Sequence, residues 1–476
     1  MSGERTEALL VTPLPPMETG LATYAVRVLE HTRDSIRWTV AFPGKADIQS
    51  LPEGPSYIPI DALDPDDVPE RRIFQLGNSV HCFPVLQTLY VLGGTVLFHE
   101  TVIHHMIRYC CLEQGRVEDY RRELRFCFGP GAGRVERILA AKGLPDTEYD
   151  SLLKRYPLIG RAVNASHSAV CLNEYAAGSI RGCYPPGAVI TVGHPLSPVP
   201  ELAEIRKPFP VCLGMVGSFH PGRNLPDVLR AMEIIRCREP NAGLLLIGGG
   251  YPEDLPPWAM ATGRVPEREY QSWIRVLDCV LDLRHPTCGE TSGSLLEAMR
   301  AGIPPIVSAS GAFINLPSDA VIRISPDNIV QALPAAFDIL RRDDRLRTLI
   351  GRGAADHANA TGSVERLERD WERVIELAGT FSRAIVAERS PVSMAPAWVD
   401  PPQGFERDLF TGPVTWKFSD GSILTGPAGC SGGFLTAWGG GSVNGVRLPD
   451  QPAVIAFEGE ELLFNGSGRI SDVFWK

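Results

Sequence analysis

The stretch LDLRHPTCGETSGSLLEAMRA, residues 281–301, combines three structural patterns in one run of the chain. Its apolar start continues a strand expected over 278–283, a loop follows, and a helix begins near Thr291 or Ser292. Small residues at 291–294 leave the first backbone amides of this helix open, and these amides suit an anion because the helix dipole is positive there. The stretch predicts a strand–loop–helix unit with an anion site at the start of the helix.

The same alternation extends outward in both directions. Short apolar runs alternate with helical patterns from residue 7 to 192, and again from residue 211 to 386. Alternating strands and helices predict a parallel sheet covered on both faces, so the two series predict two doubly wound, Rossmann-like α/β domains. Such sheets bind ligands at the carboxyl ends of their strands, and two of them facing one another can hold a donor and an acceptor.

Linkers rich in proline divide the chain. The segment HPLSPVPELAEIRKPFP at 194–210 separates the two series, which predicts a first domain over 1–204 and a second over 205–388. A further domain is expected over 405–476, where short β-type runs are separated by turn residues and no helical period is visible. This pattern predicts a small all-β domain of six or seven strands.

Composition and charge restrict the class of partner. The 476 residues carry a net charge of −10, which argues against a general nucleic-acid or anionic-membrane binder, although a local basic pocket could hold a phosphate. The 11 cysteines form no Cys-x-x-Cys pair, which is typical of free thiols in a reducing compartment. Neither a signal peptide nor a long apolar span is visible, so we expect a cytoplasmic protein with at most peripheral membrane contact. The oligomeric state stays open.

Two loops could approach a phosphate. In GMVGSFHPGRNL (214–225), Arg223 follows a strand and could neutralise a diphosphate, although an arginine there is more often a surface residue. In PLPPMETGLATYA (13–25), Gly20 opens a helix and would let the backbone approach a ligand closely. A simple helix start capped by Thr19 fits the second pattern equally well.

Several side chains could contact a sugar. Glu290 and Glu297 could each accept two hydrogen bonds from vicinal hydroxyls, but a dipole-complementing Glu290 and a solvated Glu297 are about equally expected. His99 and Glu100 lie at the carboxyl end of a strand, where ligands bind. The histidines of FHETVIHHMI (98–107) lack the zincin spacing, and no third metal ligand is apparent, so no metal site is predicted.

Taken together, the motifs resemble a known family. The chain resembles the retaining GT-B-fold glycosyltransferases of the glycosyltransferase family 4 group, in particular the bacterial branch with a Gly-Glu-Thr-Ser-Gly loop. The matching segments are PLPPMETGLATYA (13–25), FQLGNSVHCF (74–83), VLFHETVIHH (96–105), GSFHPGRN (217–224), TGRVPE (262–267) and LRHPTCGETSGSLLEAMRAGIPPIVS (283–308).

The resemblance implies the GT-B fold and a retaining, metal-independent transfer without a cofactor. The donor would be a UDP- or GDP-linked sugar, and the acceptor a glycan, a lipid-linked glycan or a protein, as in bacterial polysaccharide biosynthesis. The alternatives are a GT-B-fold sugar-nucleotide epimerase, and a non-catalytic binding protein that uses the β domain. A dinucleotide oxidoreductase would need a glycine fingerprint that the sequence does not offer.

The resemblance also implies roles for individual residues. Arg223 would contact the diphosphate, Val265 the base, Glu297 the ribose and Glu290 the transferred sugar, while His99 would lie over that sugar. The implied catalytic residues are Glu290, Arg223 and His99; the donor-binding residues are Gly20, Ser218, Val265, Arg284, Thr291, Ser292, Gly293, Ser294, Leu295 and Glu297; the acceptor-side residues are Asn78, His81 and Glu100. Ser218 stands where the family often has a second basic residue.

Overall fold

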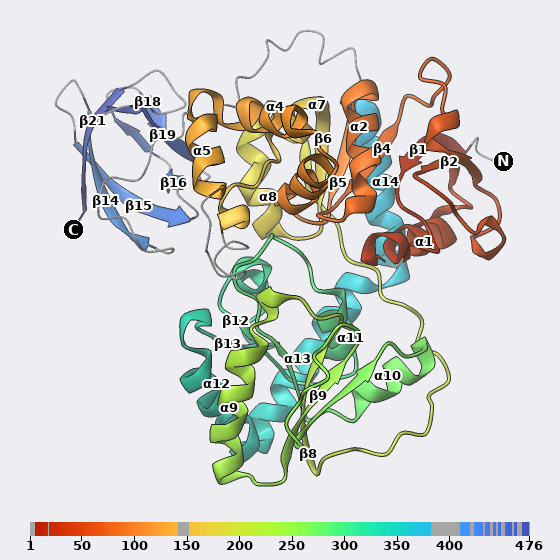
Figure 1. The fold of residues 1–476 in the computed structure, drawn as a ribbon, viewed down its shortest axis with the longest axis vertical. Helices are drawn as coiled ribbons and strands as arrows, with labels where there is room; N and C mark the ends of the chain where they lie inside the picture. Colours follow the sequence, from red (N-terminus) through yellow and green to blue (C-terminus); the bar gives the residue numbers. More distant parts are fainter. Residues whose placement is uncertain are drawn as a thin grey trace.

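The computed structural model describes residues 5–17, 19–140 and 152–381, together with the backbone of strands between residues 410 and 475. Two α/β lobes lie one above the other (Figure 1). Each lobe is built on one parallel sheet, as the alternating pattern predicts, so the expected pair of doubly wound domains is confirmed.

The first lobe contains a seven-stranded sheet in the order β3-β2-β1-β4-β5-β6-β7. Its strands are β1 (Thr6–Val11), β2 (Ile36–Phe42), β3 (Ser56–Pro59), β4 (Arg72–Leu76), β5 (Gly94–Phe98), β6 (Ser166–Cys171) and β7 (Val189–Thr191). Its helices include α1 (Gly20–Thr32), α2 (Phe83–Leu92), α3 (His104–Arg108), α4 (Val117–Phe128), α5 (Ala132–Leu139), α7 (Gly160–Ala165) and α8 (Glu174–Ile180). Strand β5 is buried along its whole length, as expected for a strand covered on both faces.

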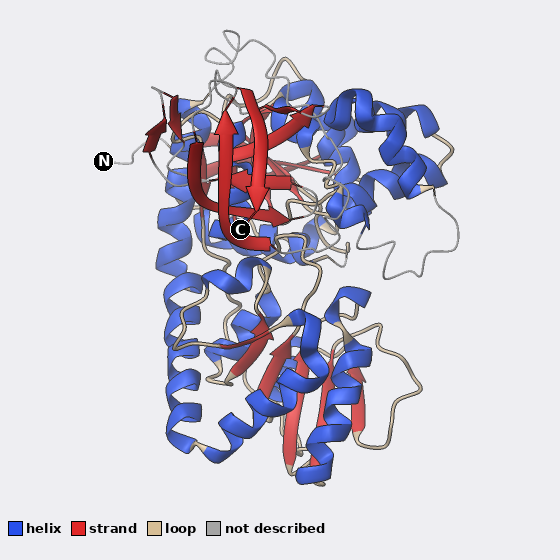
Figure 2. Cartoon of the chain, turned by 90° about the vertical axis from the view of Figure 1, so that its left-hand side faces the viewer, coloured by secondary structure: helices blue, strands red, loops and turns tan. Residues whose placement is uncertain are grey.

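The second lobe contains a six-stranded sheet in the order β10-β9-β8-β11-β12-β13, with helices on both sides of the strands (Figure 2). Its strands are β8 (Val211–Val216), β9 (Ala242–Ile247), β10 (Ala259–Gly263), β11 (Cys279–Asp282), β12 (Pro305–Ser308) and β13 (Ile322–Ile324). Its helices are α9 (Leu225–Arg238), α10 (Glu267–Arg275), α11 (Gly293–Arg300), α12 (Ile329–Arg342) and α13 (Asp344–Gly362).

The strand order reverses once in each sheet, between β1 and β4 and between β8 and β11. In open α/β sheets the crevice at such a reversal, outside the carboxyl ends of the strands, is where ligands bind. The loops that leave β1, β4, β8 and β11 carry the motifs identified in the sequence. The fold therefore gathers those motifs at the two positions where an α/β protein binds small molecules.

One helix crosses from the second lobe to the first. Helix α14 (Val364–Thr380) falls within the second domain predicted over 205–388, but it packs on the first sheet (Figure 1). Leu367, Trp371 and Val374 join the buried core that β1 and β2 form with α1, and the rings of Trp371 and Trp38 lie 5.6 Å apart. The last helix of the second series thus ties the two lobes together.

The sequence pattern does not predict the three short strands β3, β10 and β13, and each of them lies at a sheet edge. Edge strands are partly exposed and lack the apolar run of a central strand; no residue of β10 is fully buried.

The C-terminal strands close into an antiparallel barrel: β14 (Phe410–Phe418), β15 (Ile423–Ser431), β16 (Phe434–Ala437), β19 (Ala453–Glu458), β20 (Glu461–Leu463) and β21 (Arg469–Trp475). Strands β17 (Gly441–Val443) and β18 (Val446–Leu448) form a separate pair, so the all-β region has more strands than predicted.

Candidate functional site

The loop after β11 joins the two lobes directly. Thr101 of the first lobe donates a backbone hydrogen bond to the Cys288 carbonyl at 2.8 Å. Asn173, which also belongs to the first lobe, donates through Nδ2 to the Gly289 carbonyl and to Thr291 Oγ1, both at 2.9 Å. The Gly-Glu-Thr-Ser-Gly loop is therefore fixed from the opposite side of the inter-lobe boundary as well as from its own lobe.

Ser292 organises the junction between this loop and helix α11. Its hydroxyl accepts a hydrogen bond from Leu295 N–H at 3.3 Å, which caps the helix, and donates to Asp282 Oδ2 at 2.5 Å. Arg284 Nη2 also donates to this hydroxyl at 2.8 Å. The predicted start of the helix near Ser292 is confirmed, because Gly293 is its first residue.

Asp282 anchors the network at the end of β11. Burial alone would raise the pKa of its carboxyl, but the guanidinium groups of Arg284 and Arg223 outweigh burial and lower it. Arg284 Nε donates to Asp282 Oδ1 at 2.8 Å, and Arg223 Nη2 lies 3.5 Å from the same oxygen. The carboxyl is thus ionised and shared by two cations.

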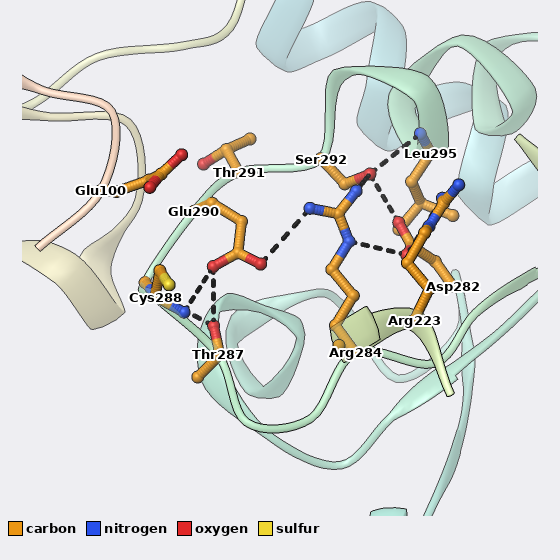
Figure 3. A network of polar contacts seen from close by, with 12 residues as sticks. Glu100, Arg223, Asp282, Arg284, Thr287, Cys288, Glu290, Thr291, Ser292 and Leu295 are labelled. Atoms are coloured by element: carbon orange, nitrogen blue, oxygen red, sulfur yellow. Dashed lines mark hydrogen bonds and ion pairs between the residues drawn. The ribbon is translucent and has the colours of Figure 1, made fainter. Parts of the chain in front are cut away.

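Glu290 is held by the loop rather than by the helix dipole. Its Oε2 accepts hydrogen bonds from Cys288 N–H at 2.7 Å and from Thr287 Oγ1 at 3.0 Å, while Arg284 Nη1 lies 3.3 Å from Oε1. Burial would raise the pKa of Glu290, but Arg284 and the backbone amides outweigh burial and lower it. Figure 3 shows the Arg284 guanidinium between Glu290 on one side and Ser292 and Asp282 on the other.

Arg223 is an interior side chain, with 1% of its surface exposed. Its guanidinium donates to the carbonyls of Val216 at 2.5 Å and Gly217 at 3.0 Å, and to Tyr251 Oη at 2.9 Å. The surface arginine weighed from the sequence is therefore not what the structure contains. Arg223 stabilises the loop after β8 and shares the charge of Asp282; a direct contact with a diphosphate stays a prediction.

Arg223 nevertheless lies close to the start of α11. A Cβ atom built on Gly217 would lie 3.0 Å from Ser294 Oγ and 3.5 Å from Arg223 Nη1, so both groups flank the same glycine. Gly293 is packed just as closely, because a Cβ there would lie 2.9 Å from His194 Cε1. The absence of side chains at 217 and 293 therefore lets the loop after β8 and the His194 ring approach the start of α11 closely.

Glu297 occupies a buried network that spans both lobes. Its carboxylate accepts hydrogen bonds from Ser197 N–H and Gln271 Nε2, both at 3.1 Å, and forms an ion pair with Arg300. Arg27 of helix α1 lies 3.9 Å away, across the boundary between the lobes. Glu297 is thus not a solvated helix residue, and its predicted contact with a ribose would have to exchange with these partners.

Other predicted donor residues lie on loops with fewer contacts. Around Gly20, no heavy atom lies within 4 Å of a built Cβ, so the start of α1 faces open space. Ser218 is exposed after β8, where its carbonyl accepts a hydrogen bond from Arg223 at 3.4 Å. Val265 is half-buried between β10 and α10. These positions are compatible with ligand approach, and their roles stay predictions.

His99 and Glu100 follow β5 on the first-lobe side of the site. Glu100 Oε2 accepts a hydrogen bond from Asn78 N–H at 3.2 Å, and burial followed by the nearby charge of Glu290 raises the pKa of Glu100 to about 7. The His99 ring packs edge-on against Tyr24 at 4.8 Å, and its buried Nε2 has no hydrogen-bond partner among the described residues. Burial lowers the pKa of His99 to about 3.

Asn78 shapes the backbone around these two residues. Its Oδ1 accepts from Met106 N–H at 3.0 Å, and its Nδ2 lies 2.7 Å from His105 Nδ1. His81 lies in the short helical turn between β4 and α2, where its N–H donates to Ser79 Oγ at 3.4 Å. The Asn78 side chain is therefore engaged with α3, and only its backbone is directed to Glu100.

Comparison with known proteins places the fold. No family model and no curated protein matches the sequence. A sucrose-phosphate synthase from Thermosynechococcus elongatus matches with a TM-score of 0.51 and 14% identity, over 81% of this chain and 100% of that chain. The chain has the GT-B fold. The Anabaena protein HepE, solved with UDP-glucose, has a TM-score of 0.49 and 10% identity, over 78% of this chain and 100% of that chain.

Within this GT-B fold, the structure adds residues that the motifs do not contain. Lys154 of the first lobe donates through Nζ to the Pro286 carbonyl at 3.0 Å, and a Cβ on Gly222 would lie 3.0 Å from the same nitrogen. Lys154 thus places a third cation beside the Glu290 loop, in addition to Arg284 and Arg223. No sequence signal marks it, because it belongs to a helical stretch remote from every motif.

No helix in the described part of the chain is both long and apolar enough to cross a membrane. Within the same residues, no three side chains of histidine, cysteine, aspartate or glutamate come together as a candidate metal site.

Proposed function

We propose that the protein is a glycosyltransferase that moves a sugar from a nucleotide-diphosphate sugar to a hydroxyl group of an acceptor. One observation carries the proposal: the Arg284, Glu290 and Ser292 network lies at the start of α11, at the reversal point of the second sheet. The loop that contains Glu290 also contacts the opposite lobe through Cys288 and Gly289. An anion site beside an anchored carboxylate matches a donor that joins a diphosphate to a sugar.

The second lobe would bind the donor. The diphosphate would lie against the backbone amides from Thr291 to Ser294, since the Leu295 N–H already donates to Ser292 Oγ. Positive charge would be supplied by Arg284, Arg223 and Lys154. Glu290 would accept hydrogen bonds from hydroxyls of the transferred sugar, since an ionised carboxylate accepts from vicinal hydroxyls. Glu297 would do the same for the ribose, and the backbone at Val265 would contact the base.

The chemistry requires stabilisation of the leaving group. As the bond between the sugar and the diphosphate breaks, negative charge grows on the diphosphate oxygens. Fixed donors already aimed at that charge lower the barrier, and loss of one such donor typically reduces the rate by about 10²–10³. Because three cations surround this position, we propose a transfer that needs no metal ion. We also propose that the sugar keeps its configuration, as the resemblance to the retaining family implies.

The first lobe would bind the acceptor. Asn78, His81 and Glu100 lie on the loops after β4 and β5, across the boundary from Glu290, and His99 would cover the transferred sugar. We propose a glycan, lipid-linked glycan or protein as the acceptor. The shared fold with a sucrose-phosphate synthase supports a glycoside-forming reaction of this kind.

A panel of activated sugars tests the function. The purified protein is incubated with UDP- and GDP-linked sugars, with and without candidate hydroxyl acceptors, and nucleotide diphosphate release is measured. Release that increases with an acceptor, together with a glycoside product of retained configuration by NMR, is the expected result. An isomerised donor without an acceptor would instead indicate an epimerase. Activity that disappears on chelation and returns with a divalent metal would contradict metal independence.

A further inference from the structure

His194 lies outside the segments that resemble the known family, and it reaches the start of α11 from the linker between the domains. A Cβ atom built on Gly293 would lie 2.9 Å from His194 Cε1 and 3.1 Å from His194 Nε2. Gly293 is the first residue of α11 and supplies one of the backbone amides proposed for the diphosphate. The imidazole of His194 therefore lies at the edge of the proposed anion site.

The same imidazole also packs near the start of α1. The rings of His194 and Tyr24 lie 5.6 Å apart, and Tyr24 is one turn into the helix that begins at Gly20. The amino end of a helix carries a partial positive charge, and both α1 and α11 present that end near His194. An anion beside this imidazole would thus be attracted by two helix dipoles, one from each lobe.

A contact within the linker decides which ring nitrogen of His194 can meet a ligand. Nδ1 lies 3.1 Å from the Pro195 carbonyl oxygen, which can only accept a hydrogen bond, so Nδ1 carries the proton of the neutral ring. Nε2 makes no hydrogen bond among the described residues, and His194 is partly exposed. In the neutral ring Nε2 offers a lone pair, and it becomes a donor when it takes up a proton.

The groups around His194 favour a neutral ring when no anion is bound. Burial, and then the guanidinium of Arg27, lower the pKa of His194 to about 4. His99, which also packs against Tyr24, is neutral as well, with a pKa of about 3. The other charged groups on elements packed against the linker are Asp370, which accepts from Gly193 N–H at 2.8 Å, and the ion pair of Glu297 and Arg300, which contacts Ser197. The negative charge of a diphosphate would favour the imidazolium instead.

We propose that His194 binds the diphosphate of the sugar donor through Nε2 and takes up a proton from solvent as it does so. The imidazolium then donates to the Pro195 carbonyl through Nδ1 and to a diphosphate oxygen through Nε2. No bond of the donor breaks in this step, and the proton returns to solvent when the nucleotide diphosphate leaves. During transfer, the growing charge of the leaving diphosphate strengthens this hydrogen bond. The inference rests on the proposed function and adds one residue and one proton to its donor site.

Proton uptake on donor binding tests the proposal. Each UDP- and GDP-linked sugar of the panel is titrated, because the diphosphate of such a sugar has no group that ionises near neutral pH. Calorimetric titration at pH 6 in two buffers of different ionisation enthalpy gives the number of protons taken up. For the wild-type protein we expect an uptake of about one proton. The Kd should rise about tenfold per pH unit over the range where the free ring is neutral and the bound ring is charged.

Two variants of His194 locate the proton. Asparagine keeps an N–H in the place of Nδ1 but has no second ring nitrogen. For His194→Asn we expect no proton uptake, donor binding weaker by about tenfold to a hundredfold, and transfer slower by about 10²–10³. His194→Gln places a neutral amide near the position of Nε2, and it should bind the donor without proton uptake. His357→Asn is the matched control, since His357 of α13 is partly buried, has a lowered pKa and lies near Asp319; it should change neither uptake nor transfer.

Two results would overturn the role of His194. One is a wild-type protein that binds a donor without taking up a proton. The other is proton uptake that persists in both His194 variants, since it would then belong to another group near the site, such as His220 or Glu100. Failure of the proposed function is distinguishable from both, because the wild-type protein would then neither bind nor transfer any sugar of the panel, and the inference would fall with it.

Discussion

Arg284 joins Glu290 to Asp282: its Nη1 lies 3.3 Å from Glu290 Oε1 and its Nε donates to Asp282 Oδ1 at 2.8 Å. One guanidinium thereby fixes the loop carboxylate to the end of β11. The fork geometry of arginine makes this possible, and the single ammonium of lysine cannot reproduce it.

Arg284→Lys should therefore fail to preserve activity. Glu290 and Ser292 would each lose a directed donor, and we expect a decrease of about 10²–10³ in kcat/KM for transfer. Steady-state kinetics with the best donor measure this change. Arg342→Lys is the control, since that side chain is 78% exposed in the same lobe. Kinetics indistinguishable from wild type in Arg284→Lys would show that the bridge plays no part in transfer.

Because Arg223 is buried, we expect its substitution to lower the stability of the protein. Arg223→Ala would leave Asp282 with one cation instead of two and would remove donors from two buried carbonyls, so we expect a loss of stability of about 3–5 kcal/mol. Combining Arg223→Met with Asp282→Asn should cost less than the sum of the single changes, because the charges are then removed together. Urea unfolding of the wild type, Arg223→Met, Asp282→Asn and the double variant measures this coupling. Strictly additive losses of stability would contradict it.

The sequence predicts a feature of the site only where that feature depends on residues close by in the chain. The start of α11 near Ser292 depends on neighbours within ten residues, so the motif predicts it. Lys154 and Asn173 reach the same loop from remote parts of the chain, and nothing in their own sequence neighbourhoods marks them. The same limit applies to Arg223, whose burial depends on how the loop after β8 packs against Asp282.

Packing across the lobes also explains why the last helix of the second series lies on the first lobe. Helix α14 has an ordinary amphipathic pattern, which predicts a helix but not the sheet that it covers. Helix α14 covers the first sheet because Trp371 packs against Trp38 in the first lobe. The sequence pattern does not predict the short edge strands β3, β10 and β13 for a related reason, since the neighbouring strand rather than their own apolar content holds them in place.

Lys154→Gln tests the cation that the first lobe contributes. The charge of Lys154 lowers the pKa of both Glu100 and Glu290, so its loss should move the acidic limb of the transfer pH profile to higher pH. The KM for the donor should also rise and depend less on ionic strength, because one attractive charge is gone. Lys207→Gln, which removes a lysine paired with Asp278, should change neither property. A pH profile that does not move would contradict this role.

Glu100 should also affect stability as a function of pH. Its pKa is about 7 in the folded protein and near 4.5 as a free side chain, so the folded state binds more protons between these values. Stability from this group is therefore present at low pH and is lost as pH rises through about 7. Glu100→Gln should raise the melting temperature more at pH 8 than at pH 5. An equal change at both pH values would show that burial does not penalise the carboxylate.

Gly289 offers the sharpest test of the contact between the lobes. It has φ of +81°, and a built Cβ would lie 2.6 Å from Thr101 Oγ1 of the first lobe. Gly187 has φ of +82°, but no heavy atom lies within 4 Å of its built Cβ. Both alanine variants carry the same backbone strain, of about 1–2 kcal/mol, and only Gly289→Ala adds a steric conflict across the boundary.

We therefore expect Gly289→Ala to lose more stability than Gly187→Ala and, unlike it, to reduce kcat for transfer, because the Glu290 loop is displaced from the first lobe. Adding Thr101→Ala to Gly289→Ala removes the conflicting hydroxyl and should restore part of the loss. Thermal unfolding and transfer kinetics of the three variants decide the question. If the two glycine variants behaved alike, backbone strain alone would explain both, and the contact through Thr101 would contribute nothing to the site.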